Sequence, residues 1–387
     1  MLSFDNTEVA FSGKNNGDLN RSYWLFKLIG NPLVVNVGQS LTTMAIGMHL
    51  PIKGMIKATI FKQFVGGENI NECNKTIENL GAYKIGTILD YSVEGKESES
   101  DFTHCVNETL GTIDKAKGNK NIPYCVFKIT GLARFALLER ASSGLPLTAA
   151  EREEFSKVHD RVNTICKRAF DNNVPVFMDA EESWIQQATD DLANEMMSLY
   201  NKEKAIVYNT FQMYRKDRLA YLKKSVEMGQ KGNYIVAAKL VRGAYMEKER
   251  KRANEMNYPS PIQDSKQDTD GDYDSALEFC VDHINRVAIC AGTHNEHSSM
   301  YLTDLMKKKN ISPSNPHVCF SQLLGMSDHI SFNLANAGYN VAKYVPYGPV
   351  KDVLPYLIRR ARENTSVKGQ TGRELALIIK EKRRRSA

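Results

Sequence analysis

The sequence predicts an α/β fold, a closed (β/α)8 TIM-like barrel, and three observations indicate it. Eight short apolar runs, rich in β-branched and aromatic residues, recur between residues 84 and 370. They alternate with longer amphipathic stretches of helical period. The runs are continuous rather than strictly alternating, as in parallel strands that helices cover, and polar side chains follow their ends, where barrel enzymes carry their chemistry.

The elements follow one another in a regular order. The expected strands cover residues 85–91, 124–129, 174–178, 205–209, 235–241, 287–291, 317–321 and 341–345. Helical patterns lie between them at 150–169, 183–200, 216–229, 273–287 and 298–308. The polar stretch 254–274, which contains two prolines, is expected to be an inserted loop after the fifth strand, on the side of the site.

Two segments flank the barrel, which is assigned to residues 84–370. Residues 1–83 are expected to form an N-terminal helical arm, and residues 371–387 a basic C-terminal tail. Within the arm, residues 33–50 are uncharged, but polar residues interrupt the apolar run and Pro51 ends it, which favours a buried helix over a membrane span.

Composition excludes several classes of protein. The chain has 387 residues, 42% hydrophobic and 25% charged, as in an ordinary globular protein with a sizeable core. Its seven cysteines include no C-x-x-C pair and several lie in apolar runs, which indicates reduced, buried thiols. Glycine-rich nucleotide-binding motifs are absent, and His294 with His297 lacks the other ligands of a metal site, so no metal is expected.

The net charge of +6 is modest and is concentrated in the run Lys380 to Arg385. A terminal basic run is most often solvated, and this one also suits peripheral contact with an anionic membrane surface. Aromatic residues are not interleaved with it, so a nucleic-acid partner is not expected. The expected location is the cytoplasm, with contact at the inner face of a membrane, or the mitochondrial matrix if the chain is a processed eukaryotic one.

The segment 354–363 carries the most informative pattern. At helical spacing Tyr356, Arg359, Arg360 and Glu363 share one face, and Leu354, Leu357, Ile358 and Ala361 share the other. A helix with two guanidinium groups and an aromatic ring on one face suits the binding of a small carboxylate. A solvated helix face explains the same spacing equally well.

Several motifs together resemble the proline dehydrogenase family, from about residue 84 to residue 366. They occur in the family's order and are Met178-Asp-Ala-Glu-Glu182, Lys239-Leu-Val-Arg-Gly-Ala-Tyr245, Gly292-Thr-His-Asn295, Cys319-Phe-Ser-Gln-Leu-Leu-Gly-Met326, Lys343-Tyr-Val-Pro-Tyr-Gly-Pro349 and the helix 356–364. The resemblance implies a barrel that oxidises L-proline to 1-pyrroline-5-carboxylate by hydride transfer to non-covalently bound FAD. A membrane quinone is the implied electron acceptor.

The resemblance also implies a substrate pocket. Arg359 and Arg360 would hold the substrate carboxylate with Lys128, while Leu323, Tyr344 and Tyr356 pack against a small saturated ring. Asp179 would hold Lys128 or the arginines, and the simplest structural expectation is that Lys128 and Asp179 pair directly. Glu94 is expected to pair with one of the arginines. The residues implied to be catalytic are Lys128, Asp179, Tyr344, Arg359 and Arg360.

The implied FAD contacts gather at the ends of the fourth to seventh strands and on the last barrel helix. They are Asn209, Gln212, Lys239, Arg242, Gly243, Ala244, Met246, Thr293, His294, Asn295, Gln322 and Glu363. Lys239 stands where the family often has Arg, and it offers one charged centre in place of a planar fork. A structural ion pair is the alternative for Lys239, and a core or helix-capping residue is the alternative for His294.

Two other functions stay open. Relatives that prefer hydroxyproline tend to have a smaller residue at position 344, so Tyr344 favours proline over a hydroxyproline dehydrogenase. A barrel that binds a ligand without catalysis is the third reading.

Overall fold

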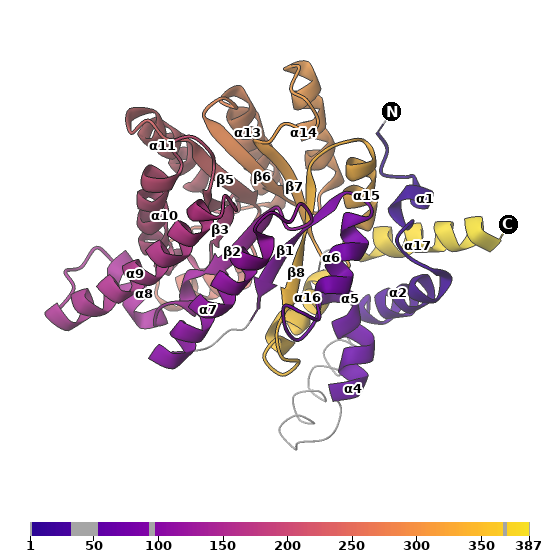
Figure 1. Cartoon of the computed structure of the whole chain (residues 1–387), viewed down its shortest axis with the longest axis horizontal. Helices are drawn as coiled ribbons and strands as arrows, with labels where there is room; N and C mark the ends of the chain where they lie inside the picture. Colours follow the sequence, from indigo (N-terminus) through magenta and orange to yellow (C-terminus); the bar gives the residue numbers. More distant parts are fainter. Residues whose placement is uncertain (1, 32–52, 93–96, 367–369, 387) are drawn as a thin grey trace.

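The computed structural model describes residues 2–31, 53–92, 97–366 and 370–386, and its centre is a closed barrel of eight parallel strands in sequence order (Figure 1). The predicted fold is therefore confirmed. The strands are β1 Ile85–Tyr91, β2 Tyr124–Lys128, β3 Val176–Asp179, β4 Val207–Gln212, β5 Val236–Val241, β6 Val287–Gly292, β7 Val318–Leu323 and β8 Val341–Tyr347. Pairing of β1 with β8, from Ile85 with Val341 to Tyr91 with Tyr347, closes the ring.

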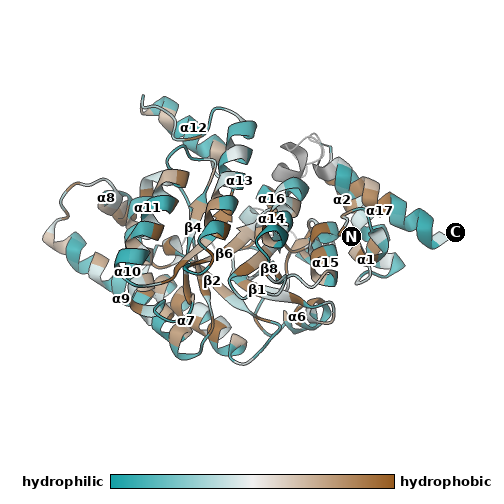
Figure 2. Ribbon diagram, turned by 90° about the horizontal axis from the view of Figure 1, so that it is seen from above, coloured by the Kyte–Doolittle hydropathy of each residue, from teal (hydrophilic) through white to brown (hydrophobic). Residues whose placement is uncertain are grey.

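Helices surround this ring. Those that follow the strands are α7 Glu99–Ala116, α8 Phe135–Ser142, α9 Ala149–Asp171, α10 Gln186–Tyr200, α11 Arg218–Lys231, α12 Met246–Glu255, α13 Lys266–Asp282, α14 Glu296–Lys308, α15 Asp328–Asn336 and α16 Leu354–Ser366. The helices before the barrel are α1 Thr7–Ala10, α2 Asn16–Ile29, α4 Lys53–Ile56, a π-helical turn Lys57–Phe61, α5 Lys62–Phe64 and α6 Asn74–Gly81. Apolar residues concentrate toward the strands and polar ones outside (Figure 2).

Alternation along each strand separates two apolar layers. One set of side chains fills the barrel interior and includes Tyr124, Phe177, Tyr208, Cys290 and Tyr344. The other set packs outward against the helices. All seven cysteines are buried and free, as the sequence indicates. The last inward-facing side chain of each strand therefore lies at the C-terminal rim of the barrel, which we call the mouth.

The predicted loop 254–274 is only partly a loop. Helix α13 begins at Lys266, because the Ser265 hydroxyl accepts a hydrogen bond from the backbone N–H of Asp268, and the Asp268 carboxylate accepts one from the backbone N–H of Ser265, a capping box. Thr269 and Tyr273 are buried on its inner face. The many aspartates concealed this helix start, since they made the whole stretch read as polar loop.

The basic C-terminal run belongs to a packed helix, although several of its basic side chains remain exposed. Helix α17 (Gln370–Ser386) lies against α1 and α2 at one side of the barrel, so both ends of the described chain meet there (Figures 1 and 2). Leu377 and Ile378 are buried in the cluster that also contains Phe26 and Leu357. Glu381 is fully buried between Arg384 and Arg385, so part of the basic charge neutralises an acid inside the packing.

Candidate active site

Three inward-facing residues from separate strands form the centre of the mouth. The Nζ of Lys239 on β5 lies 2.6 Å from the Asp179 carboxylate on β3 and donates to the Tyr344 hydroxyl on β8 at 2.5 Å. That hydroxyl donates in turn to Asp179 at 3.3 Å. Lys239 also lies 4.2 Å from the centre of the Tyr344 ring. The three side chains form a closed polar triangle directly above the aromatic interior.

The expected pair of Lys128 with Asp179 is wrong. Asp179 is occupied by Lys239, and the Nζ of Lys128 lies 3.4 Å from the Asp90 carboxylate at the end of β1. The reason is the barrel register. Lys239 reaches across from β5 to Asp179, while Lys128 turns to the opposite neighbour, β1. Sequence reasoning did not select Asp90, although a carboxylate that ends a buried strand is the same signal that selected Asp179.

A second carboxyl group near Lys128 was also missed. Glu181, in the loop after β3, accepts hydrogen bonds from the backbone N–H of Thr130 at 3.2 Å and from its hydroxyl at 2.8 Å. Burial raises the pKa of Glu181 to about 7, against the opposing influence of nearby Lys128 and of Thr130. The motif Met178 to Glu182 contained this residue, but of its three acids only Asp179 was selected. A carboxyl group of this kind can take up or release a proton near neutral pH.

The end of β5 forms a basic corner. Arg242 donates to the hydroxyls of Thr293 at 2.7 Å and Ser298 at 2.9 Å, and it pairs with Asp270 at 2.7 Å. Gly243 follows with φ +133°, and a Cβ there would lie 2.5 Å from the Tyr214 ring, so only glycine fits. Ala244 lies just beyond it, and Met246 begins α12. The predicted residues of this motif therefore share one corner of the mouth.

The end of β6 supplies a neutral histidine. His294 is partly buried, and its Nδ1 lies 2.9 Å from the Ser327 hydroxyl. Burial, together with the positive charges of Lys343, Arg360 and Arg242, lowers the pKa of His294 to about 3. The imidazole is therefore uncharged at physiological pH.

The residues beside His294 build the surrounding scaffold. Asn295 caps α14 by accepting from the backbone of Ser298, and Thr293 accepts from Arg242. Gln322 donates to the carbonyl of Thr293 at 3.0 Å and accepts from Ser331 at 2.7 Å. The capping role foreseen as an alternative for His294 therefore belongs to Asn295.

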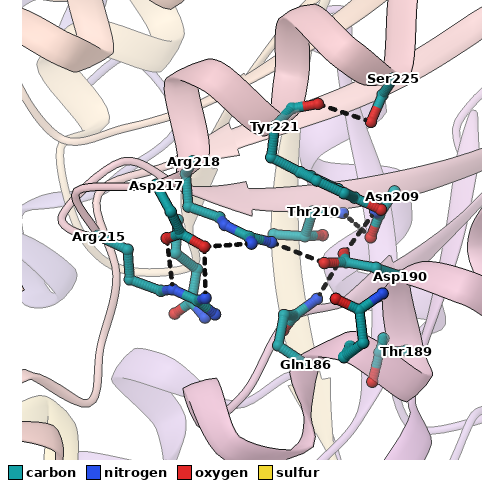
Figure 3. A network of polar contacts seen from close by, with 12 residues as sticks. Gln186, Thr189, Asp190, Asn209, Thr210, Arg215, Asp217, Arg218, Tyr221 and Ser225 are labelled. Atoms are coloured by element: carbon teal, nitrogen blue, oxygen red, sulfur yellow. Dashed lines mark hydrogen bonds and ion pairs between the residues drawn. The ribbon is translucent and has the colours of Figure 1, made fainter. Parts of the chain in front are cut away.

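The two predicted residues of β4 point in different directions. Gln212 is buried at the mouth and donates to the carbonyl of Glu181 at 2.6 Å. Asn209 lies on the outward side and donates to Asp190 of α10 at 2.9 Å, within a network that also contains Gln186 and Arg218 (Figure 3). The expected cofactor contact of Asn209 is therefore corrected, because the alternation of β4 turns its side chain away from the mouth.

Helix α16 brings the aromatic ring and the arginines to the barrel. Tyr356 and Arg360 are buried, with the guanidinium carbon 5.2 Å from the ring centre, and Arg359 is half-buried. A solvated helix face does not explain this burial. Leu323 packs against both the interior cluster of Tyr344 and the cluster of α16, so it lies between strand and helix. Glu363 belongs to α16 with its side chain outside the described residues, and Glu94 lies outside them altogether.

The described residues contain no group of three His, Cys, Asp or Glu side chains that could hold a metal ion. Within the same residues, no helix has both the length and the apolar character needed to cross a membrane.

Comparison with known proteins adds independent information. The family model for proline dehydrogenase matches residues 73–373. Proline dehydrogenase 1, mitochondrial, from Dictyostelium discoideum is 33% identical over 98% of this chain and 74% of its own length. Hydroxyproline dehydrogenase from Xenopus laevis is 31% identical over 99% of this chain and 90% of its own length.

Solved structures share the fold. Proline utilization A from Bdellovibrio bacteriovorus, inactivated by N-propargylglycine, superposes with a TM-score of 0.73 at 20% identity over 93% of this chain. The chain spans 38% of the length of that protein. The family match covers most of the chain, including every motif on which the sequence argument depends. The chain therefore belongs to the proline dehydrogenase family. It is an oxidoreductase, and its family membership supports proline oxidation as its activity.

Proposed function

We propose that this chain oxidises L-proline to 1-pyrroline-5-carboxylate at the barrel mouth, with non-covalently bound FAD. The observation that carries the proposal is the meeting of cationic groups with an apolar wall. Lys239 and Lys128 project from strands into the mouth, and buried Arg360 enters from α16 close enough to influence the pKa of His294. Leu323 and Tyr344 supply the adjoining apolar surface.

The corner around Arg242 fits an anionic cofactor. Arg242 is partly exposed and is held by two hydroxyl groups and by Asp270, and α12 starts four residues further along, at Met246. A guanidinium group and the N-terminal amides of a helix together suit a pyrophosphate. Gly243 allows close approach of the backbone. Bound flavin would supply the acceptor for a hydride from the ring carbon next to the substrate nitrogen.

The described residues would orient the substrate. Arg359 and Arg360 offer forked donors that match a carboxylate and stay charged at any working pH, with Lys128 as a further cation. Leu323, Tyr344 and Tyr356 would confine the pyrrolidine ring. Because the reacting carbon must face the cofactor, holding both ends of so small a molecule contributes most of the catalytic effect.

The substrate nitrogen must lose its proton before hydride transfer. Asp90 and Asp270 at this end of the barrel are paired with Lys128 and Arg242. The other acids there are Asp179, held by Lys239 and Tyr344, and Glu181, with a pKa of about 7. Glu181 suits a proton acceptor that works near neutral pH. Lys239 keeps Asp179 in place and adds positive charge at the mouth.

The electron acceptor and the location are part of the same proposal. We place the enzyme in the mitochondrial matrix, on the ground that several relatives are named mitochondrial. A membrane quinone is the proposed acceptor, with exposed basic residues of α17, such as Arg383, at the membrane surface.

The decisive experiment is anaerobic mixing of the purified protein with L-proline. Loss of the oxidised flavin absorbance, with formation of 1-pyrroline-5-carboxylate, is the expected result. Trans-4-hydroxy-L-proline in a parallel cell tests the second candidate, which the Xenopus laevis relative favours. If hydroxyproline reduces the flavin faster than proline does, hydroxyproline is the preferred substrate. A protein that binds FAD but is reduced by neither compound would indicate a ligand-binding barrel.

Acid precipitation of the same preparation tests the mode of cofactor binding. All flavin should pass into the supernatant, and colour retained in the precipitate would contradict non-covalent attachment.

A further inference from the structure

The first turns of α17 are attached to two loops of the mouth. Arg373 donates to Glu296 at 2.8 Å, directly after the Thr293–Asn295 motif. The next residue, Glu374, accepts a hydrogen bond from the backbone N–H of Ser327, in the loop after β7. The first loop carries the proposed cofactor contacts Thr293 to Asn295, and the second follows β7, which carries Gln322. A helix that follows the barrel in sequence therefore fixes two parts of the site.

Ser327 is held in an unusual conformation. The φ angle of Ser327 is +51°, a left-handed value that is uncommon for serine, and Ser327 is fully buried. Glu374 is also buried, and its carboxylate opposes the lowering of the pKa of Lys343 by burial, while the ammonium group of Lys343 pairs with Asp328. Conformational strain of this kind persists only where the surroundings enforce it. The carboxylate of Glu374 is one such restraint, because it receives the N–H that this conformation directs toward α17.

Two further contacts restrain the same loop. Gln63 donates to the carbonyl of Gly325 at 2.9 Å, and Lys343 donates to the carbonyl of Met326 at 2.5 Å. A Cβ at Gly325 would lie 2.1 Å from the backbone oxygen of Gln63, so the arm presses closely on the loop. The loop is thus fixed from the arm, from β8 and from α17.

The restrained loop determines where the Ser327 hydroxyl lies. Its hydrogen-bond partner among the described residues is the Nδ1 of His294. A buried hydroxyl donates its proton where an acceptor is within reach, and a neutral imidazole has one acceptor nitrogen. If Ser327 donates to Nδ1, the ring proton of His294 resides on Nε2. Among the described residues, the side-chain hydrogen bond of His294 is made through Nδ1, which leaves Nε2 for a ligand.

We propose that Glu374 of the C-terminal helix is a positioning residue, which acts through Ser327 to hold His294 as the Nε2–H tautomer. The histidine then presents a neutral donor to the cofactor. The value of this arrangement for catalysis rests on the proposed cofactor role of His294, but the tautomer itself does not. Glu374 is separated from the reacting atoms by two residues and acts only on orientation and tautomer.

The experiment compares Ser327→Ala, Glu374→Ala and Glu374→Gln with Glu381→Gln as the matched control. Glu381 is an equally buried acid on the same helix, but it binds Arg384 and Arg385 at the far end. The protein is labelled with 15N at histidine and freed of flavin, and the His294 signals are assigned by their loss in His294→Asn. Long-range 15N–1H spectra then report the tautomer without any need for activity.

The wild type should show a protonated Nε2 and an unprotonated Nδ1. Ser327→Ala and Glu374→Ala should give mixed tautomers and raise the dissociation constant for added FAD roughly three- to tenfold, the effect of one hydrogen bond. Glu374→Gln keeps an acceptor oxygen and should restore most of both properties. Glu381→Gln should lower thermal stability while leaving both unchanged.

Three results would overturn the proposal: an Nδ1–H tautomer in the wild type, an unaltered tautomer in both alanine variants, or an equal effect of Glu381→Gln. A wild-type protein that fails to bind FAD would refute the proposed function instead. The spectra of the flavin-free protein would still decide the role of Glu374.

Discussion

Two aspartates on opposite sides of the barrel wall, one buried and one partly exposed, form ion pairs with different roles. Asp190, on α10, is 1% exposed and accepts hydrogen bonds from Arg218 at 2.7 Å, Asn209 at 2.9 Å and Gln186 at 3.0 Å. Asp179, at the end of β3, binds Lys239 and Tyr344, and its side chain is 14% exposed. One acid is enclosed by helices, whereas the other faces the open mouth.

The difference teaches that a buried ion pair does not by itself indicate a site. The Asp190 network joins α10, β4 and α11, so its contacts stabilise the layer of helices outside the barrel (Figure 3). The Asp179 triangle joins three strands at the end where barrel enzymes carry their chemistry. Position in the barrel, rather than composition, separates structure from function.

The largest expected effect comes from Asp190→Asn. The change removes the charge that neutralises Arg218 and places amide donors against Asn209 and Gln186, so the free energy of unfolding should fall by about 3–5 kcal/mol. Urea unfolding measures the loss. Asp217→Asn is the control, since Asp217 binds the same Arg218 but is 49% exposed, and it should cost at most about 1 kcal/mol. Equal losses would show that burial is not the cause.

The same substitution at the mouth should act on activity. Asp179→Asn leaves an acceptor oxygen for Lys239, and the Tyr344 hydroxyl still binds it, but Lys239 loses its counter-ion, so the free energy of unfolding should fall by about 1–3 kcal/mol. Loss of the carboxylate should lower kcat/KM for proline ten- to hundredfold, about 1.5–3 kcal/mol in the transition state. Steady-state kinetics and thermal unfolding on one preparation separate the two effects. A stable variant with unchanged kinetics would remove Asp179 from the site.

Glu181 sharpens the comparison because a hydroxyl and an amide, rather than a direct ion pair, hold this buried acid. Its pKa in the folded protein is about 7, above its ordinary value of 4.5. The folded state therefore binds the proton more tightly than the unfolded state. Its stabilising contribution is present at acid pH and is lost as pH rises from about 4.5 to about 7.

Glu181→Gln cannot titrate, so the variant should lack this pH dependence. Between pH 4.5 and 8 the wild type should lose on the order of 2 kcal/mol relative to the variant. Urea unfolding of both proteins at several pH values measures the difference. Parallel stability curves would mean that Glu181 ionises normally in the folded state.

The smallest expected effect concerns Tyr344, whose hydroxyl completes the triangle at the mouth. Tyr344→Ser opens space beside Leu323, which should lower kcat/KM for proline and shift the ratio toward hydroxyproline roughly three- to tenfold. Tyr344→Phe removes the hydroxyl but keeps the ring, so it should leave that ratio near the wild-type value. If the ratio stays constant in the serine variant, Tyr344 does not contact the substrate.

Much of the site was predictable because its residues follow strand ends. The continuous apolar runs located the strands to within a few residues. The residues predicted at the strand ends do lie at the mouth: Lys128, Asp179, Lys239 and Tyr344. The predicted pairing of Lys128 was wrong because β2 lies between β1 and β3, and the sequence does not show which neighbouring strand supplies the acid. Asn209 was misplaced because β4 continues to Gln212, beyond the strand end expected at residue 209, and the alternation of the strand turns Asn209 outward.

The sequence by itself determined the (β/α)8 barrel, its strand order and the family. Apolar periodicity and local motifs depend on neighbouring residues, and parallel strands with crossover helices leave few ways to close the ring. Only the tertiary structure decided which acid binds Lys239, that the basic tail is the packed helix α17, and that Glu374 reaches Ser327. These contacts join residues far apart in the chain, and side-chain pairing over such separations depends on geometry that local sequence does not encode.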